Sequence, residues 1–257
     1  MEFKNNEQKE ENGSFENLIF GRNSCLEAVR SGREIDKLLI AHGTTGGTIT
    51  AIIAKCKEKG ILIKEVSPKK LDFLANGINH QGVAVSFAAQ SYATVDDILK
   101  IAEEKNQPPF IIICDEIEDP HNLGAIIRTA ECTGAHGIII PKRRSASLNA
   151  TVAKSASGAL EYMAVARVTN IAETIEKLKE KGVWVFGADM DGKDYTQFDY
   201  NMPCALVIGN EGKGIGTLVA KRCDEIISLP MFGNINSLNA SVAAGVLMYE
   251  VVKKRNN

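Results

Sequence analysis

The feature that most constrains the fold of this chain is an uninterrupted apolar run at residues 110–114. A strand that is apolar on both sides must be covered on both faces, as in parallel sheets whose connections are helices. Helical patterns alternate with short apolar segments on both sides of this run. The sequence therefore predicts an α/β fold, with further strands at residues 17–20, 35–41, 61–66, 83–89, 137–140, 163–168, 183–188, 205–208 and 225–229.

The helices expected between these strands begin at capping residues or proline, and several end at glycine. They cover residues 23–30, 49–59, 68–75, 94–104, 122–132, 149–157 and 172–181. A last helix is expected to begin at Ser237 as its N-cap and to end with the basic residues 253–255. Its small and branched apolar residues point to nearly all sides, so we expect it to be mostly buried.

The length of 257 residues allows one large domain or two ordinary ones. Residues 1–14 are polar and charged, which predicts a disordered tail. We expect a small α/β domain at 15–90, a linker helix within 91–109, and a larger α/β domain at 110–257. The sequence has neither a membrane-spanning apolar run nor a signal-peptide pattern, so we expect no membrane contact and a cytoplasmic location.

Cysteine and histidine usage predicts no metal site. The six cysteines are scattered without a C-x-x-C pair, and the four histidines lack the spacing of metal ligands. The net charge of −2 argues only weakly against a nucleic-acid partner. Residues 121–160 hold five bases and one acid, which indicates either a phosphate-binding face or an ordinary solvated surface.

Three loops with small and polar residues follow three of the predicted strands. They lie at 119–130, at 208–216, and at 228–231 with 236–241. Ligands of open α/β sheets bind beyond the carboxyl ends of strands, so these loops predict a small-molecule site with Arg128 and Glu211 as candidate charges. Residues 208–216 match neither a Walker A loop nor a dinucleotide fingerprint. Taken alone, the polar residues 236–241 favour an ordinary helix cap, and the Gly/Thr loop 43–47 favours a simple connector.

The same three stretches resemble the motifs of the SpoU/TrmH family, RNA ribose 2′-O-methyltransferases of the SPOUT superfamily. They read N-L-G-A-I-I-R-T-A (122–130), I-G-N-E-G-K-G-I-G (208–216) and S-L-P-M with S-L-N-A-S-V-A-A-G-V-L-M-Y-E (228–231 and 237–250). Residues 141–159 are similar to family members that methylate a guanosine of large-subunit ribosomal RNA. Residues 19–29 and 80–85 resemble the ribosomal-protein-like substrate-binding domain of those enzymes.

The resemblance implies a C-terminal SPOUT domain with a deep trefoil knot, a homodimer, and S-adenosylmethionine as the cofactor. Its target would be ribosomal RNA, with transfer RNA as the alternative; a non-catalytic RNA-binding factor is the competing class. By position in the motifs, the implied cofactor-binding residues are Gly209, Asn210, Glu211, Leu229, Met231 and Leu238. The implied catalytic residues are Arg128, Glu211, Asn239 and Ser241, and the implied RNA-binding residues are Asn122, Lys142, Arg143, Arg144 and Asn149.

Chemistry limits the roles of these residues. A guanidinium almost never gives up its proton, so Arg128 is expected to bind phosphate and stabilise developing charge rather than act as a base. Glu211 is expected to orient Arg128 or the ribose, and Asn239 and Ser241 to position the hydroxyl or Arg128. His121 is open between a base and a structural role.

Overall fold

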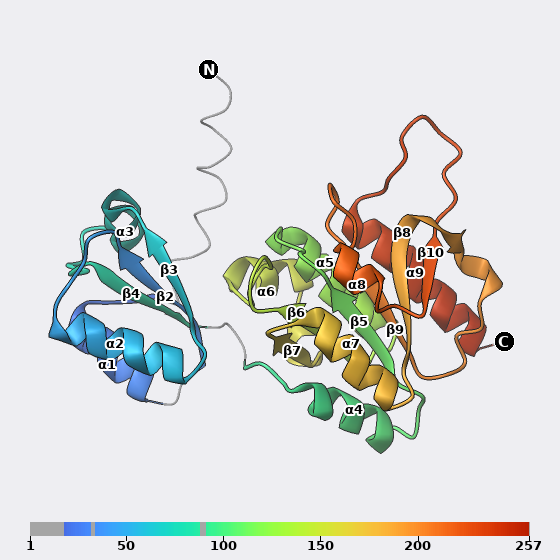
Figure 1. The fold of residues 1–257 in the computed structure, drawn as a ribbon, viewed down its shortest axis with the longest axis horizontal. Coiled ribbons are helices and arrows are strands. Elements are labelled where there is room, and N and C mark those ends of the chain that lie inside the picture. Colours follow the sequence, from blue (N-terminus) through green and yellow to red (C-terminus); the bar gives the residue numbers. More distant parts are fainter. Residues whose placement is uncertain (1–17, 32–33, 88–90, 257) are drawn as a thin grey trace. The chain divides into compact units, whose positions relative to one another are not determined.

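The computed structural model describes residues 18–31, 34–87 and 91–256, and the chain divides into two units. One unit extends to Ser91 and includes Ser147–Thr151; the other comprises Tyr92–Ala146 and the chain from Val152 onward. Each unit has its own sheet (Figure 1). The expected tail at 1–14, together with residues 17 and 88–89 of two expected strands, lies outside the described residues.

The first unit is a four-stranded mixed sheet in the order β1-β4-β2-β3. β2 (Ile35–Ala41) pairs in parallel with β3 (Leu62–Val66), whereas β4 (Val83–Phe87) is antiparallel to both β2 and β1 (Leu18–Phe20). Alternate residues of the strands enter two cores, as a pleated strand requires. One core packs on α1 (Arg22–Arg30) and α2 (Gly47–Glu58), and the other packs on α3 (Pro68–Ala75).

The second unit is built on six strands that all run parallel, in the order β10-β8-β9-β5-β6-β7. The central strand β5 (Phe110–Cys114) is buried at all five residues, so the prediction of a parallel sheet covered on both faces is confirmed. The other strands are β6 (Gly137–Pro141), β7 (Val165–Val168), β8 (Trp184–Asp194), β9 (Cys204–Ile208) and β10 (Glu225–Ser228).

Helices cover the two faces of this sheet. α4 (Val95–Glu104), α7 (Ile171–Glu180) and α8 (Thr217–Ala220) pack on the face that contains Ile111 and Ile113. α5 (Pro120–Cys132) and α9 (Ala240–Arg255) pack against each other and against β6 and β9. α6 (Ala150–Ala156) lies next to α5, where a Cβ on Gly124 would come within 2.4 Å of the Ser155 Cβ. None of these described helices is long and apolar enough to cross a bilayer.

β8 and α8 both differ from the sequence prediction. β8 continues to Asp194 rather than ending at residue 188, because its polar second half pairs with β10 across a register shift. Gly192 makes this approach possible, since a Cβ there would lie 2.5 Å from the backbone carbon of Ile227. The short helix α8 was not predicted. All six cysteines are free thiols, and burial raises the pKa of Cys114 to about 12.

The last turn of α9 is fixed by Arg255. Its guanidinium donates hydrogen bonds to the carbonyls of Pro108, Pro109, Tyr200 and Met202, all at 2.9–3.0 Å. It also lies over the ring of Phe110, 5.3 Å from the centroid. One side chain therefore ties the end of the chain to the entrances of β5 and β9.

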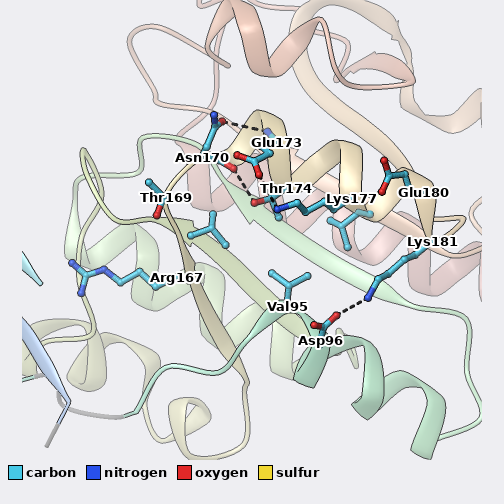
Figure 2. A pocket seen from close by; sticks show the side chains of 12 residues that line it. Val95, Asp96, Arg167, Thr169, Asn170, Glu173, Thr174, Lys177, Glu180 and Lys181 are labelled. Carbon is cyan, nitrogen blue, oxygen red and sulfur yellow. Dashed lines mark hydrogen bonds and ion pairs between the residues drawn. The ribbon is translucent and has the colours of Figure 1, made fainter. Parts of the chain in front are cut away.

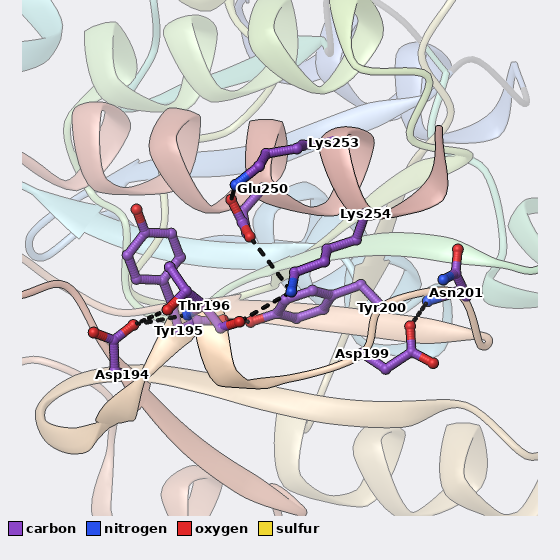
Figure 3. Close-up of polar contacts among 9 residues, drawn as sticks. All are labelled: Asp194, Tyr195, Thr196, Asp199, Tyr200, Asn201, Glu250, Lys253 and Lys254. Atoms are coloured by element: carbon purple, nitrogen blue, oxygen red, sulfur yellow. Dashed lines mark hydrogen bonds and ion pairs between the residues drawn. The ribbon is translucent and has the colours of Figure 1, made fainter. Parts of the chain in front are cut away.

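A second polar cluster secures the same half of α9 (Figure 3). Glu250 is buried at 7% exposure and pairs with Lys253 at 3.3 Å. Lys254 donates to the Thr196 carbonyl at 3.0 Å and lies 4.0 Å from Glu250 Oε1, which has no hydrogen-bond partner among the described residues. The C-terminal half of α9 is thus held to the segment after β8.

Candidate active site

The loops after β5 and β9 are joined at the carboxyl edge of the sheet. Asp115 continues the ladder of β5 by donating its N–H to the Ile208 carbonyl at 2.8 Å. Its buried carboxylate accepts the Gly216 N–H at 2.8 Å. Burial raises the pKa of Asp115, the hydrogen bond from Gly216 opposes the shift, and the charge of Glu116 adds to it. The carbonyl of Glu116 accepts from Asn210 Nδ2 at 3.1 Å, so two consecutive acids shape the next loop.

The loop at 209–216 folds back on itself. Asn210 and Gly214 exchange backbone hydrogen bonds of 3.0 and 2.8 Å, and Asn210 Oδ1 accepts the Gly212 N–H. A Cβ on Gly209 would lie 2.3 Å from the backbone carbon of Gly214, which no side chain can tolerate. Glycine at 209 is therefore required by the close approach of two backbone segments.

Asn122 is not the N-cap that the sequence predicted. The N-cap of helix α5 is three residues earlier, at Asp119, with Pro120 in the first turn, and Asp119 accepts the His121 N–H at 2.9 Å. Proline suits the first helical position because its missing N–H would have no partner there. The side chain of Asn122 is consequently available for other contacts, and it is buried at 7% exposure.

Asn122, Glu211 and Asn239 form one hydrogen-bonded cluster. Asn122 Nδ2 donates to Glu211 Oε1 at 2.9 Å, and Asn239 Nδ2 donates to Asn122 Oδ1 at 2.9 Å and also to Glu211 Oε1. The Ala240 N–H is a third donor to the same carboxylate oxygen, at 3.3 Å. The three loops singled out in the sequence therefore meet in one place, through three predicted site residues.

Asn239 is also the N-cap of α9. Its Oδ1 accepts from the N–H groups of Ser241 and Val242 at 3.0 and 3.3 Å and from the Ser241 hydroxyl at 2.6 Å. The prediction of Ser237 as the cap is wrong, because the Asn239 amide, held by the cluster, starts the helix two residues later. Ser241 is brought to the site through Asn239.

The segment between β10 and α9 is the most exposed part of the site. Leu229 is half-buried, whereas Met231 and Leu238 are 37% and 40% exposed. α9 was expected to be mostly buried; it buries one side, and Val242, Val246 and Tyr249 are exposed on another.

Arg128 lies on α5 outside the cluster. Its side chain is exposed and donates to the Ser157 hydroxyl at 3.4 Å. Glu211 accepts from two amide groups and a backbone N–H, and Arg128 is not among its donors. The expected contact of Glu211 with the ribose stays a prediction. The structure thus joins Glu211, Asn239 and Ser241 directly and leaves Arg128 oriented by a serine 29 residues away.

The predicted RNA-binding residues after β6 are not equivalent. Arg144 pairs with Glu116 at 2.8 Å, and this contact raises the pKa of its guanidinium. Both residues adopt positive φ angles, 54° and 58°. Arg143 is exposed, and Lys142 is half-buried. Asn149 belongs to the segment grouped with the first unit.

Asp115 and Glu116 were missed by the sequence interpretation. The available signal was a pair of acids placed directly after a strand that is buried on both faces. Such residues stand at the carboxyl edge of the sheet, where ligand sites of this architecture form.

A cavity of about 760 Å³ lies elsewhere in the second unit, between α4, the end of β7 and α7 (Figure 2). Its walls carry acids and bases together, including Asp96 paired with Lys181. None of the predicted site residues lines it. Among the described residues, no group of three or more histidine, cysteine or acidic side chains is placed to hold a metal ion.

Comparison with known families gives two matches. Residues 109–249 match the SpoU rRNA Methylase family, and residues 18–93 match the RNA 2′-O ribose methyltransferase substrate-binding family. The chain is 54% identical over 239 residues to the putative TrmH family tRNA/rRNA methyltransferase YacO of Bacillus subtilis, covering 93% of this chain and 96% of that protein. It is 47% identical over 241 residues to a putative TrmH family tRNA/rRNA methyltransferase of Staphylococcus aureus, with 93% and 97% covered.

Solved structures similar to this chain are also methyltransferases. The SpoU methyltransferase AviRb from Streptomyces viridochromogenes, crystallised with AdoMet, is 25% identical with a TM-score of 0.59, covering 98% of this chain and 94% of that chain. An rRNA methyltransferase from Sinorhizobium meliloti is 27% identical with a TM-score of 0.58, with 96% and 90% covered.

Proposed function

This chain belongs to the SpoU rRNA methylase family, and we propose that it methylates the ribose 2′-hydroxyl of a guanosine in 23S ribosomal RNA. The observation that carries the proposal is the cluster of Asn122, Glu211 and Asn239, one residue from each of the three family motifs. The substrate-binding match at 18–93 and the structural similarity to a named rRNA methyltransferase support an RNA target. The likeness of residues 141–159 to guanosine-specific members supports the finer assignment.

The cofactor is S-adenosylmethionine, which supplies the methyl group from a sulfonium centre when bound. The residues present fit such a ligand. At Gly209 the backbone closely approaches that of Gly214, so backbone N–H and C=O groups lie at the edge of the sheet, where a ligand can reach them. The exposed side chains of Met231 and Leu238 offer apolar contacts. Gly209, Asn210, Leu229 and Leu238 would hold it chiefly through their backbone.

Glu211 positions the hydroxyl of the ribose. Its Oε1 already accepts three hydrogen bonds, whereas Oε2 accepts none from a described residue. A carboxylate oxygen with lone pairs available accepts a hydrogen bond from a hydroxyl, and this contact orients the 2′-oxygen for attack. Asn122 and Asn239 fix the carboxylate so that the orientation is set before the substrate arrives.

Arg128 binds the phosphate next to the target nucleotide. Its guanidinium is exposed and is held by a single long hydrogen bond to Ser157. A planar group with several N–H donors suits a phosphate and stabilises negative charge that develops on the ribose oxygen. It serves as a donor and not as the proton acceptor.

The active form is a homodimer with a trefoil-knotted SPOUT domain, as family membership implies. An exposed apolar stripe on α9 supports the dimer: Val242, Val246 and Tyr249 lie at i, i+4 and i+7 and are 52%, 39% and 56% exposed. A second copy of this chain would cover the stripe. Val246→Lys should then give monomers in light scattering, whereas an unchanged dimer would exclude this face. We place the reaction in the cytoplasm.

The test is methyl transfer from radiolabelled S-adenosylmethionine to 23S ribosomal RNA, with transfer RNA in parallel because the relatives are named for both. Mapping of 2′-O-methyl groups should give one guanosine in 23S RNA. A product in transfer RNA would replace the proposed substrate. Cofactor binding without transfer to either RNA would point to a non-catalytic RNA-binding factor.

A further inference from the structure

One face of α5 presents two donors separated by a glycine. His121, Gly124 and Arg128 stand at i, i+3 and i+7, so all three lie on the same side of the helix. His121 and Arg128 are exposed, whereas Gly124 is buried. The donors are about 10 Å apart along the helix axis, two turns of an α-helix.

Gly124 allows the C-terminal end of α6 to lie directly on this face. A Cβ at 124 would come within 2.4 Å of the Ser155 Cβ and 2.9 Å of the Val152 carbonyl oxygen. The close packing places Ser155, in the last turn of α6, opposite His121, and Ser157, which directly follows α6, opposite Arg128. His121 Nδ1 and Ser155 Oγ are 3.1 Å apart, and Arg128 Nη1 donates to Ser157 Oγ at 3.4 Å.

These contacts leave donors directed outward. If the Ser155 hydroxyl donates to Nδ1 of His121, the ring proton is on Nε2, where it faces away from the serine. Arg128 uses one of its five N–H groups on Ser157. Lys154 is exposed on the same turn, and Ser157 and Gly158 reverse the chain with φ angles of 51° and 88°.

The charge balance of this surface favours an anion. His121, Arg128 and Lys154 form no ion pair with any described residue, whereas Arg144 in the neighbouring basic loop is paired with Glu116. Glu131 is the single acid between residues 121 and 160, and Asp119 and Glu161 flank this stretch. A surface with several unpaired donors and cations is suited to phosphate groups.

We propose that the α5–α6 seam, defined as His121, Arg128, Lys154, Ser155 and Ser157, binds the RNA backbone over more than one phosphate group. This inference rests on the proposed function and extends it from the single phosphate at Arg128 to the strand beside the target nucleotide. The contacts are to phosphate, so the seam contributes affinity and register rather than base selection.

The test measures the salt dependence of RNA binding by the full-length protein. Fluorescence anisotropy with a fluorescein-labelled 20-nucleotide single-stranded RNA gives the dissociation constant from 50 to 300 mM KCl. Lys154→Gln should reduce the slope of log K against log salt by about 0.7, the value for one lost contact to a single strand. Ser157→Ala, which removes a neutral donor, should weaken binding at every salt concentration and leave the slope unchanged.

The matched control is Lys177→Gln on α7. This exposed lysine is paired with Glu173 at 2.8 Å, lies outside the seam, and undergoes the same charge change. Its slope should equal that of the wild type. Calorimetry with S-adenosylmethionine should give the same affinity for all three variants, which confirms that they are folded.

The outcomes separate the two proposals. If Lys154→Gln and Lys177→Gln have the same slope while the wild type methylates RNA, the seam is refuted and the proposed function stands. If the wild type binds neither RNA nor S-adenosylmethionine, the proposed function fails and the seam fails with it.

Discussion

Replacing Arg255 with alanine should destabilise the second unit strongly, although this residue lies at the opposite end of α9 from Asn239. The substitution removes the donor for the carbonyls of Pro108, Pro109, Tyr200 and Met202. A hydrogen bond to a charged group contributes about 1.5–3 kcal/mol. Four bonds from one guanidinium are not additive, and water can reach part of the cluster, so we expect a loss of about 3 kcal/mol.

The assay is urea unfolding followed through the single tryptophan, Trp184, which lies in β8 of the same unit. Arg255→Lys should recover part of the loss, because an ammonium keeps the charge but lacks the planar fork that reaches all four carbonyls. The control is Arg222→Ala, which removes an exposed ion pair to Glu176 at 3.2 Å and should cost less than about 1 kcal/mol. If Arg255→Ala unfolds at the urea concentration of Arg222→Ala, Arg255 does not anchor the chain end.

Three further predictions concern the site and its support. Glu211→Gln keeps a side-chain oxygen that accepts from the two asparagines, but it presents an amide donor to the ribose hydroxyl. We therefore expect kcat to fall about 100-fold while thermal stability stays normal. A stable Glu211→Gln enzyme with the full rate would show that Glu211 has no part in catalysis. Gly209→Ala should abolish S-adenosylmethionine binding in calorimetry, because its Cβ would lie 2.3 Å from the backbone of Gly214; normal binding would contradict the required close approach. Burial lowers the pKa of His136 to about 4, with Lys105 and Arg255 adding to the shift, and its unfolded pKa is about 6.5. The unfolded state therefore takes up the proton first, and stability should fall as pH drops from about 6.5 to about 4 in urea titrations, with a flatter profile in His136→Asn.

The sequence predicted the strands well where the signal was local. The run Phe110–Cys114 is apolar throughout, and a strand of this composition is fully buried only when both faces of its sheet are covered. Thr94 and Asp97 form the capping box that starts α4. These two residues are close in the sequence, so the start of this helix is determined locally. β8 extended beyond its apolar part because the pairing partner, β10, comes more than thirty residues later in the chain.

The sequence pointed to Asn122, Glu211 and Asn239, which the fold brings together, but it did not predict the hydrogen bonds that connect them. Glycine-rich loops after strands indicated where Glu211 would lie, and the apolar pattern indicated α9. The sequence did not show that α5 begins at Asp119 and Pro120, which leaves the Asn122 side chain available for contacts outside the helix. It also did not show that Arg128 donates a hydrogen bond to Ser157. Both depend on side chains meeting across the fold, which no local pattern encodes.

The amide of Asn239 both holds the site cluster together and caps helix α9, so the two roles are coupled. One end of its amide closes the cluster with Asn122 and Glu211, and the other end holds the N–H groups of Ser241 and Val242. Loosening of the loops must therefore fray the first turn of the last helix. Deuterium uptake at the Ser241 and Val242 amides therefore reports whether the cluster is assembled, without substrate or turnover.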